Sequence, residues 1–258
     1  MRWPVVCSLF LLLSAVAAAA EPRLSFERSG KELGSWTAAE LAKKVAPLTV
    51  ALRHEFNSGE KRYRCLPLKP LLDAVYGEGW SGSEQSEAVF VALDGYSSYA
   101  TAAKLAEEGG CLAFDDLDVA AWEPVGRASS PKRSDPAPFF LLWTKPHQVT
   151  ASSYPWPWQV ATIRLVAFGE AYPRVVPDGA KPGSRAALGF KIFQERCFRC
   201  HAINRQGGKV GPDLNAPQSV VSYRSKRWIK DYIRAPSKYR YTEMPDHRDL
   251  EDEQLLDR

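Results

Sequence analysis

Two cysteines and a histidine lie close together near the C-terminal end of the chain, as Cys197, Cys200 and His201. Residues three and four apart share one face of a helix, so both thiols and the imidazole can reach one bound group. This CxxCH spacing is typical of c-type haem attachment, with thioether bonds to the two vinyl groups and the histidine on the iron. The alternatives are a chance match, a disulfide or half of a zinc site. A zinc site would need further ligands, and downstream only His247 follows.

The sequence around this motif agrees with haem attachment. Ser184 suits the N-cap of a helix, and Phe190 and Phe193 begin an apolar stripe that continues into the two cysteines. After the motif, residues 207–214 read Gly-Gly-Lys-Val-Gly-Pro-Asp-Leu, which resembles class I cytochromes c. The resemblance implies an all-α cytochrome c fold over residues 184–258, with one covalently bound haem c.

The same resemblance implies roles for three further residues. The carbonyl of Pro212 would accept a hydrogen bond from the second ring nitrogen of His201 and so orient this ligand. Leu214 would pack on the haem, and Trp228, in a helix expected over residues 225–233, would contact a haem propionate.

Met244 is the predicted sixth ligand of the iron. The chain has two methionines, and the other is Met1. Met244 precedes a proline in a polar loop after the expected helix 225–233, where cytochromes c present an axial thioether. A thioether favours ferrous iron and raises the reduction potential relative to a second histidine. His247 or an open coordination position remain as alternatives.

Residues 1–20 resemble a secretory signal peptide. Arg2 supplies a positive charge, an apolar run follows, and an alanine tract at 17–20 offers a cleavage site. The apolar run is short for a membrane span, and no later segment is long and apolar enough to cross a bilayer. We therefore expect a periplasmic protein without a transmembrane segment. In an oxidising compartment Cys65 and Cys111 suit a disulfide, the alternative being two buried apolar cysteines.

Charge is distributed unevenly along a chain whose formal net charge is +4. Residues 21–180 carry 17 basic and 20 acidic side chains, whereas residues 181–258 carry 16 basic and 10 acidic ones. Several basic residues gather around the expected helix 225–233: Arg224, Lys226, Arg227, Lys230, Arg234, Lys238 and Arg240. They indicate either a solvated helix face or a positive rim that steers a redox partner with an acidic contact face. Nucleic acid is not an expected partner for an exported haem protein.

Residues 21–172 are expected to form one mixed α/β domain. The pattern predicts strands over 48–52, 89–93, 139–143 and 160–168, and helices over 37–45, 69–76 and 100–108. Residues 63–73, 93–96 and 158–164 resemble the molybdopterin-binding domain of sulfite-oxidase-like oxidoreductases. That family places a molybdenum-ligating cysteine near residues 50–54, where this chain has none. The resemblance therefore implies the fold without the metal.

Residues 173–183 hold three prolines and two glycines and are expected to be a stiff linker between the two domains. The sequence as a whole predicts an exported protein that transfers single electrons through one haem, with the N-terminal domain as a docking module. No catalytic acid–base pair or nucleophile is needed for this function. Two alternatives are an oxidoreductase whose N-terminal domain binds molybdopterin or a small substrate, and a haem-based ligand sensor.

Overall fold

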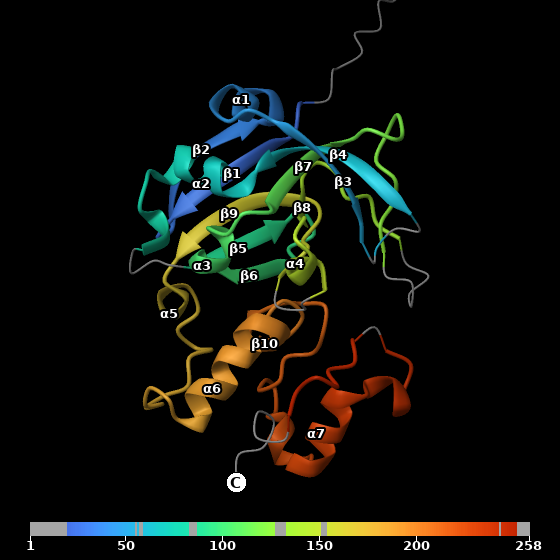
Figure 1. The fold of residues 1–258 in the computed structure, drawn as a ribbon. Helices are drawn as coiled ribbons and strands as arrows, with labels where there is room; N and C mark the ends of the chain where they lie inside the picture. The colour runs from blue at the N-terminus through green and yellow to red at the C-terminus, as the bar shows by residue number, and fades with distance from the viewer. Residues whose placement is uncertain are drawn as a thin grey trace, which may run out of the picture.

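A computed structural model describes residues 20–54, 56, 59–82, 87–126, 133–150, 154–242 and 244–251. The predicted signal peptide lies outside these residues except for Ala20. The chain forms a sheet region, residues 20–172, and a C-terminal region, residues 173–251. In Figure 1 the C-terminal segments, orange and red, lie together on one side of the sheet region.

The sheet region contains two β-sheets. A five-stranded sheet has the order β2-β1-β9-β5-β6 and a four-stranded sheet the order β3-β4-β7-β8. Neighbouring strands are antiparallel, apart from the parallel pair of β1 and β9. The strands of the first sheet are β1 (Arg23–Arg28), β2 (Lys31–Thr37), β5 (Glu87–Ala92), β6 (Ser97–Thr101) and β9 (Val160–Val166). Those of the second are β3 (Leu48–Arg53), β4 (Glu60–Pro67), β7 (Gly110–Asp116) and β8 (Phe140–Trp143).

Short helices connect and cover these sheets (Figure 1). They are α1 (Ala38–Lys44), α2 (Leu68–Tyr76), η1 (Trp80–Gly82), α3 (Ala102–Leu105), α4 (Pro146–Thr150) and α5 (Phe168–Ala171). Both sheets contribute to one apolar core with α1 and α2, in which Phe26, Leu66, Leu71 and Trp143 are completely buried. The core therefore holds the two sheets together as one unit.

The C-terminal region has little regular structure. Its elements are α6 (Arg185–Ile192), a π-helical turn η2 (Phe193–Cys197), β10 (Ala202–Ile203), β11 (Gln206–Gly207), η3 (Val220–Ser222), α7 (Lys226–Arg234) and η4 (Pro236–Lys238). The helix expected over residues 225–233 is present as α7. Throughout the part of the chain that the structure describes, no helix is long and apolar enough to cross a membrane.

The predicted fold class is wrong in both regions. The N-terminal region is not a balanced α/β domain but is dominated by its strands, several of which the sequence pattern missed. Strand β4 was missed because it points Lys61 inward next to Tyr63 and Cys65, which breaks the apolar alternation. The C-terminal region is not all-α, because glycines and prolines between α6 and α7 give loops and the short β10–β11 hairpin.

Candidate functional site

The CxxCH motif lies on the turn that ends the α6–η2 helix. The Ser184 hydroxyl accepts a hydrogen bond from the Ala187 amide at 3.3 Å and caps the start of α6. At the other end, the amides of Cys200 and His201 donate to the Cys197 carbonyl at 3.0 and 2.8 Å. The three motif residues are therefore held by one tight turn.

The imidazole of His201 is oriented by the loop that follows. Its Nδ1 lies 2.8 Å from the Pro212 carbonyl oxygen. A carbonyl can only accept, so Nδ1 carries the proton and Nε2 keeps the lone pair that a metal ligand needs. A Cβ on Gly211 would lie 2.5 Å from Cε1 of His201, so glycine lets the backbone cross the ring. This is the contact that the sequence resemblance implied for Pro212.

The loop leading to Leu214 is fixed by a residue that the sequence analysis did not single out. The Asp213 carboxylate accepts hydrogen bonds from the amides of Arg205 at 2.6 Å, Asn215 at 2.8 Å and Ala216 at 2.9 Å. Burial raises the pKa of Asp213, but these backbone donors outweigh it and lower the pKa overall. Because aspartate commonly bonds to the amide two residues on, the Asp-Leu-Asn order could have identified it.

Cys197 and Cys200 are both thiols, each partly buried. The pKa of Cys197 is raised to about 11, mainly by burial; Arg199 and Arg196 lower it, and the neighbouring Cys200 raises it. The sheet region carries the remaining pair of described cysteines as a disulfide. Cys65 of β4 and Cys111 of β7 are joined, with their Cα atoms 5.8 Å apart.

The segment around Met244 returns to both helices of the C-terminal region. The Met244 amide donates to the Thr242 hydroxyl at 3.1 Å, and the His247 amide donates to the Ile233 carbonyl of α7 at 3.3 Å. An ion pair joins Asp249 to Arg196 in η2. Met244 itself is partly buried and His247 is buried. The choice between these two as sixth ligand stays a prediction in favour of Met244.

The apolar side chains of this region fit a haem. Helices α6 and α7, every residue of which the structure describes, contain no buried residue. Leu188 of α6 is 55 % exposed. Other apolar residues of the two helices are partly buried, as are Leu214 and Met244: Phe190, Trp228, Ile229 and Ile233. An apolar group of haem size would complete their burial, and the CxxCH thiols and imidazole are the donors that such a group requires.

Trp228 lies in an aromatic stack on α7. Its ring is 4.9 Å from that of Tyr232 at 12°, and the Arg224 guanidinium lies 4.4 Å above it. Arg240 covers Tyr232 from the other end of the helix, with its Nε donating to the hydroxyl at 2.7 Å. The contact of Trp228 with a propionate remains a prediction; the Arg224 guanidinium lies against Trp228 and that of Arg240 against Tyr232.

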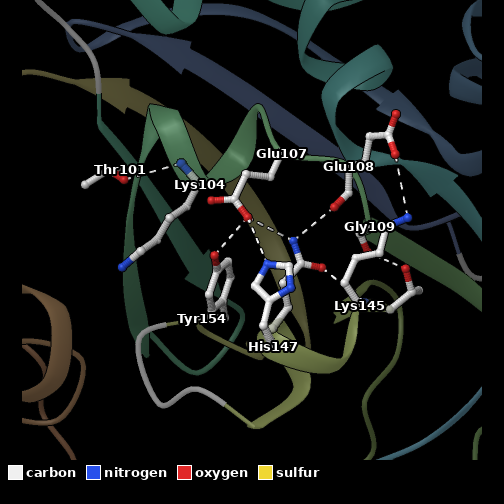
Figure 2. Close-up of polar contacts among 10 residues, drawn as sticks. Thr101, Lys104, Glu107, Glu108, Gly109, Lys145, His147 and Tyr154 are labelled. Atoms are coloured by element: carbon white, nitrogen blue, oxygen red, sulfur yellow. Dashed lines mark hydrogen bonds and ion pairs between the residues drawn. The ribbon is translucent and has the colours of Figure 1, made fainter.

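Glu107, just after α3, is the centre of a polar cluster that the sequence did not predict. Figure 2 shows Tyr154 and His147 pointing toward its carboxylate. Its Oε2 accepts from the Tyr154 hydroxyl at 2.8 Å and Gln148 Nε2 at 3.2 Å, and His147 Nε2 lies at 3.5 Å. Burial and the bond to Glu107 raise the pKa of Tyr154 to about 12. These contacts tie α4 to the end of α3.

Among the described residues, no three histidine, cysteine, aspartate or glutamate side chains are grouped so as to hold a metal ion. A hollow of about 610 Å³ lies between the chain after α5 and the loops around Leu214. Its lining includes Arg174, Val175, Ile203 and Val220. Because Leu214 is also part of the lining, this hollow adjoins the predicted haem pocket.

Comparison with known proteins identifies one part of the chain. Residues 186–257 match the sequence model of the cytochrome c family. The C-terminal region therefore contains a cytochrome c domain, which implies covalently bound haem c and haem-based electron transfer. The match begins at residue 186 and gives no support to the sulfite-oxidase-like resemblance. No curated protein sequence matches the chain.

Proposed function

Because residues 186–257 form a cytochrome c domain, we propose that this protein transfers single electrons through one haem c bound to Cys197 and Cys200. The observation that carries the proposal is the 2.8 Å contact between His201 Nδ1 and the Pro212 carbonyl. It leaves Nε2 as the metal-binding atom of the residue that directly follows the two thiols. The proposed partner of His201 on the opposite side of the iron is Met244.

The haem supplies a reversible ferric–ferrous couple when bound. The protein holds the imidazole in one tautomer through Pro212, and the partly buried apolar residues of α6 and α7 would pack against the haem. The Met244 thioether favours the ferrous state. A fixed ligand pair and an apolar surrounding suit electron exchange without substrate chemistry, so the proposed protein is a carrier rather than an enzyme.

Haem attachment is tested first. Acid–acetone extraction should leave the haem on the wild-type protein, whereas a Cys197→Ser/Cys200→Ser variant should carry no covalently bound haem. A matched Cys65→Ser/Cys111→Ser variant should keep its haem, because that pair forms the disulfide of the sheet region. Extractable haem in the wild-type protein would contradict covalent attachment.

Met244 is tested by Met244→Ala. The resemblance to cytochromes c predicts a weak far-red sulfur-to-iron band in the oxidised protein, lost in the variant together with a fall in potential. An unchanged spectrum would exclude Met244 and move the ligand to His247 or elsewhere. Rapid carbon monoxide binding to the reduced wild-type protein would favour the ligand sensor.

The proposed redox partner is acidic where it contacts α7. The side chain of Arg227 is 90 % exposed, and Arg224, Lys226, Lys238 and Arg240 are exposed around it. A reduced, strongly acidic flavoprotein should transfer electrons more slowly to Arg227→Glu/Lys238→Glu than to the wild type, and the difference should shrink at high salt. Lys31→Glu on β2 is the control and should have no effect. Equal rates for the two variants would exclude this face.

The sheet region is proposed to be a docking module for that partner, in the periplasm. The disulfide and residues 1–20 support export. Chemical cross-linking during electron transfer should join the flavoprotein to exposed lysines of the sheet region other than Lys31, such as Lys145, as well as to those of α7. Cross-links confined to α7 would remove the docking role.

A further inference from the structure

Phe198, between the two cysteines of the motif, belongs to a cluster that joins both regions of the protein. Its side chain is completely buried, although the α6 residues that precede it are not. Its ring lies 4.7 Å from Tyr172 and 4.9 Å from Phe168, both from the sheet region. Phe168 in turn lies 5.3 Å from Tyr99 of β6 and 5.7 Å from Phe190 of α6. The haem-attachment turn thus packs directly on the sheet region.

The sheet-region side of this cluster is fixed by one carboxylate. Glu87 of β5 accepts from the Tyr99 hydroxyl at 2.6 Å through Oε1 and from the Phe168 amide at 2.7 Å through Oε2. The first-turn amide of α5 is thereby bonded to the sheet. Phe168 is 3 % exposed and Tyr99 is 6 % exposed, so both rings are held in place by the side chains packed around them.

Polar contacts surround the aromatic cluster. Lys104 of α3 pairs with Glu195 of η2 at 3.7 Å, with both side chains largely buried. On the other side, the Arg174 amide donates to Gln206 at 2.8 Å and the Arg174 carbonyl accepts from Asn204 at 2.8 Å. Val175, in the expected linker, is 4 % exposed within the same cluster. The ion pair therefore joins the two regions on one side of the motif, and on the other side the start of the C-terminal region is bonded to the segment of β10 and β11.

Backbone hydrogen bonds connect Phe198, which packs on Phe168 and Tyr172, to the predicted haem-binding residues. Its amide donates to the Phe193 carbonyl at 2.8 Å, and its carbonyl accepts from Gly208 at 2.9 Å. Gly208 also donates to the His201 carbonyl at 3.1 Å. A shift of the Phe198 ring would therefore move the turn that carries Cys197, Cys200 and His201.

We propose that Phe168 and Tyr172 of the sheet region are positioning residues for the haem, acting through Phe198 on the turn that presents Cys197, Cys200 and His201. This inference rests on the proposed haem attachment. The sheet region would then help to set the reduction potential of the haem, because burial and a fixed axial ligand both affect the potential of a haem iron.

The test compares full-length variants that carry covalent haem. Phe168→Ala removes the ring that faces Phe198, and Phe168→Leu restores most of its volume. Phe26→Ala is the control, because Phe26 is equally buried in the sheet-region core and its ring neighbours are Trp36 and Tyr76. The reduction potential is measured at a temperature at which all variants are folded. The midpoint of thermal unfolding, followed by the Soret band, is recorded in parallel.

Phe168→Ala should lower the potential, because water reaching the haem favours the charged ferric form. A shift of about tenfold in the redox equilibrium corresponds to a fall of about 59 mV for one electron. The Soret midpoint should fall as well, Phe168→Leu should recover most of both changes, and Phe26→Ala should leave the potential unchanged. Equal potentials in Phe168→Ala and the wild type, or an equal fall in the control, would overturn the inference.

The ion pair gives a second measurement that keeps the aromatic cluster intact. Lys104→Glu should lower the Soret midpoint, and Lys104→Glu/Glu195→Lys should recover it, because the pair is restored with opposite polarity. No recovery in the double variant would show that this ion pair does not stabilise the haem site. If the wild-type protein carries no covalent haem, the proposed function fails before this comparison begins.

Discussion

The sheet region and the cytochrome c domain differ in how they bury apolar side chains. In the sheet region α2 alone buries four residues, and the disulfide joins two central strands. In the C-terminal region neither α6 nor α7 buries any residue, although both are fully described. A sheet can complete its core with its own side chains, whereas two short helices cannot. We therefore expect the cytochrome c domain to depend on a bound haem and on the sheet region for its stability.

The largest expected effect comes from removing the haem. The Cys197→Ser/Cys200→Ser variant should lose the folded structure of residues 184–251 and keep that of the sheet region. Hydrogen exchange should show full exchange of the α6 and α7 amides and continued protection of β5 and β9. Protected α7 amides without haem would mean that this region has a sufficient core of its own.

Removing the disulfide should affect the other region. The cross-link joins residues 46 positions apart, and the chain-entropy estimate for a loop of this length is about 4 kcal/mol. Cys65→Ala/Cys111→Ala should lower the free energy of unfolding of the sheet region by that order, as measured by urea titration. The Soret band should be unchanged at low urea, and a shifted band would show that the disulfide also shapes the haem site.

Acid should weaken the sheet region through His54. Burial lowers its pKa to about 4, and its ring is bonded to the Phe56 amide and the Tyr63 hydroxyl. The unfolded chain binds this proton near pH 6.5, so stability is full above that pH and falls as pH drops toward 4. The loss should approach about 3 kcal/mol, at about 1.4 kcal/mol per pH unit.

Urea titrations at a series of pH values measure this loss. His54→Gln should flatten the slope. A slope that persists in His54→Gln would assign the effect to other groups.

The smallest effect compares the same substitution in both regions. Ser184→Ala removes the cap of α6, and Thr37→Ala removes that of α1, where Glu40 completes a capping box. Each should cost about 1 kcal/mol. Thr37→Ala should shift the urea midpoint followed by tryptophan fluorescence, and Ser184→Ala the midpoint followed by the Soret band. The division into two regions would be contradicted if Thr37→Ala shifted the Soret midpoint and Ser184→Ala shifted the fluorescence midpoint.

Local chemistry was predictable from the sequence, and long-range packing was not. The contact of His201 with Pro212 depends on residues eleven apart in one recognisable loop. Helices α1 and α7 follow from their caps and apolar spacing, and α2 from its apolar spacing alone. Strand β4 was hidden because Lys61 points inward to Asp116 at 3.0 Å, a partner far along the chain. Phe198 stands at a variable position of the motif, so its role appears only when Phe168 and Tyr172 are seen beside it.

The complete burial of Phe198, which lies between the two thiols, bears on the order of maturation. We expect the thioether bonds to form before this segment packs against the sheet region. The sheet region precedes it in the chain and has the parts for its own core, so it can fold first. The CxxCH segment would then pack against Phe168 and Tyr172 after the thioether bonds have formed. Haem attachment would be the step after which the CxxCH turn packs on the sheet region.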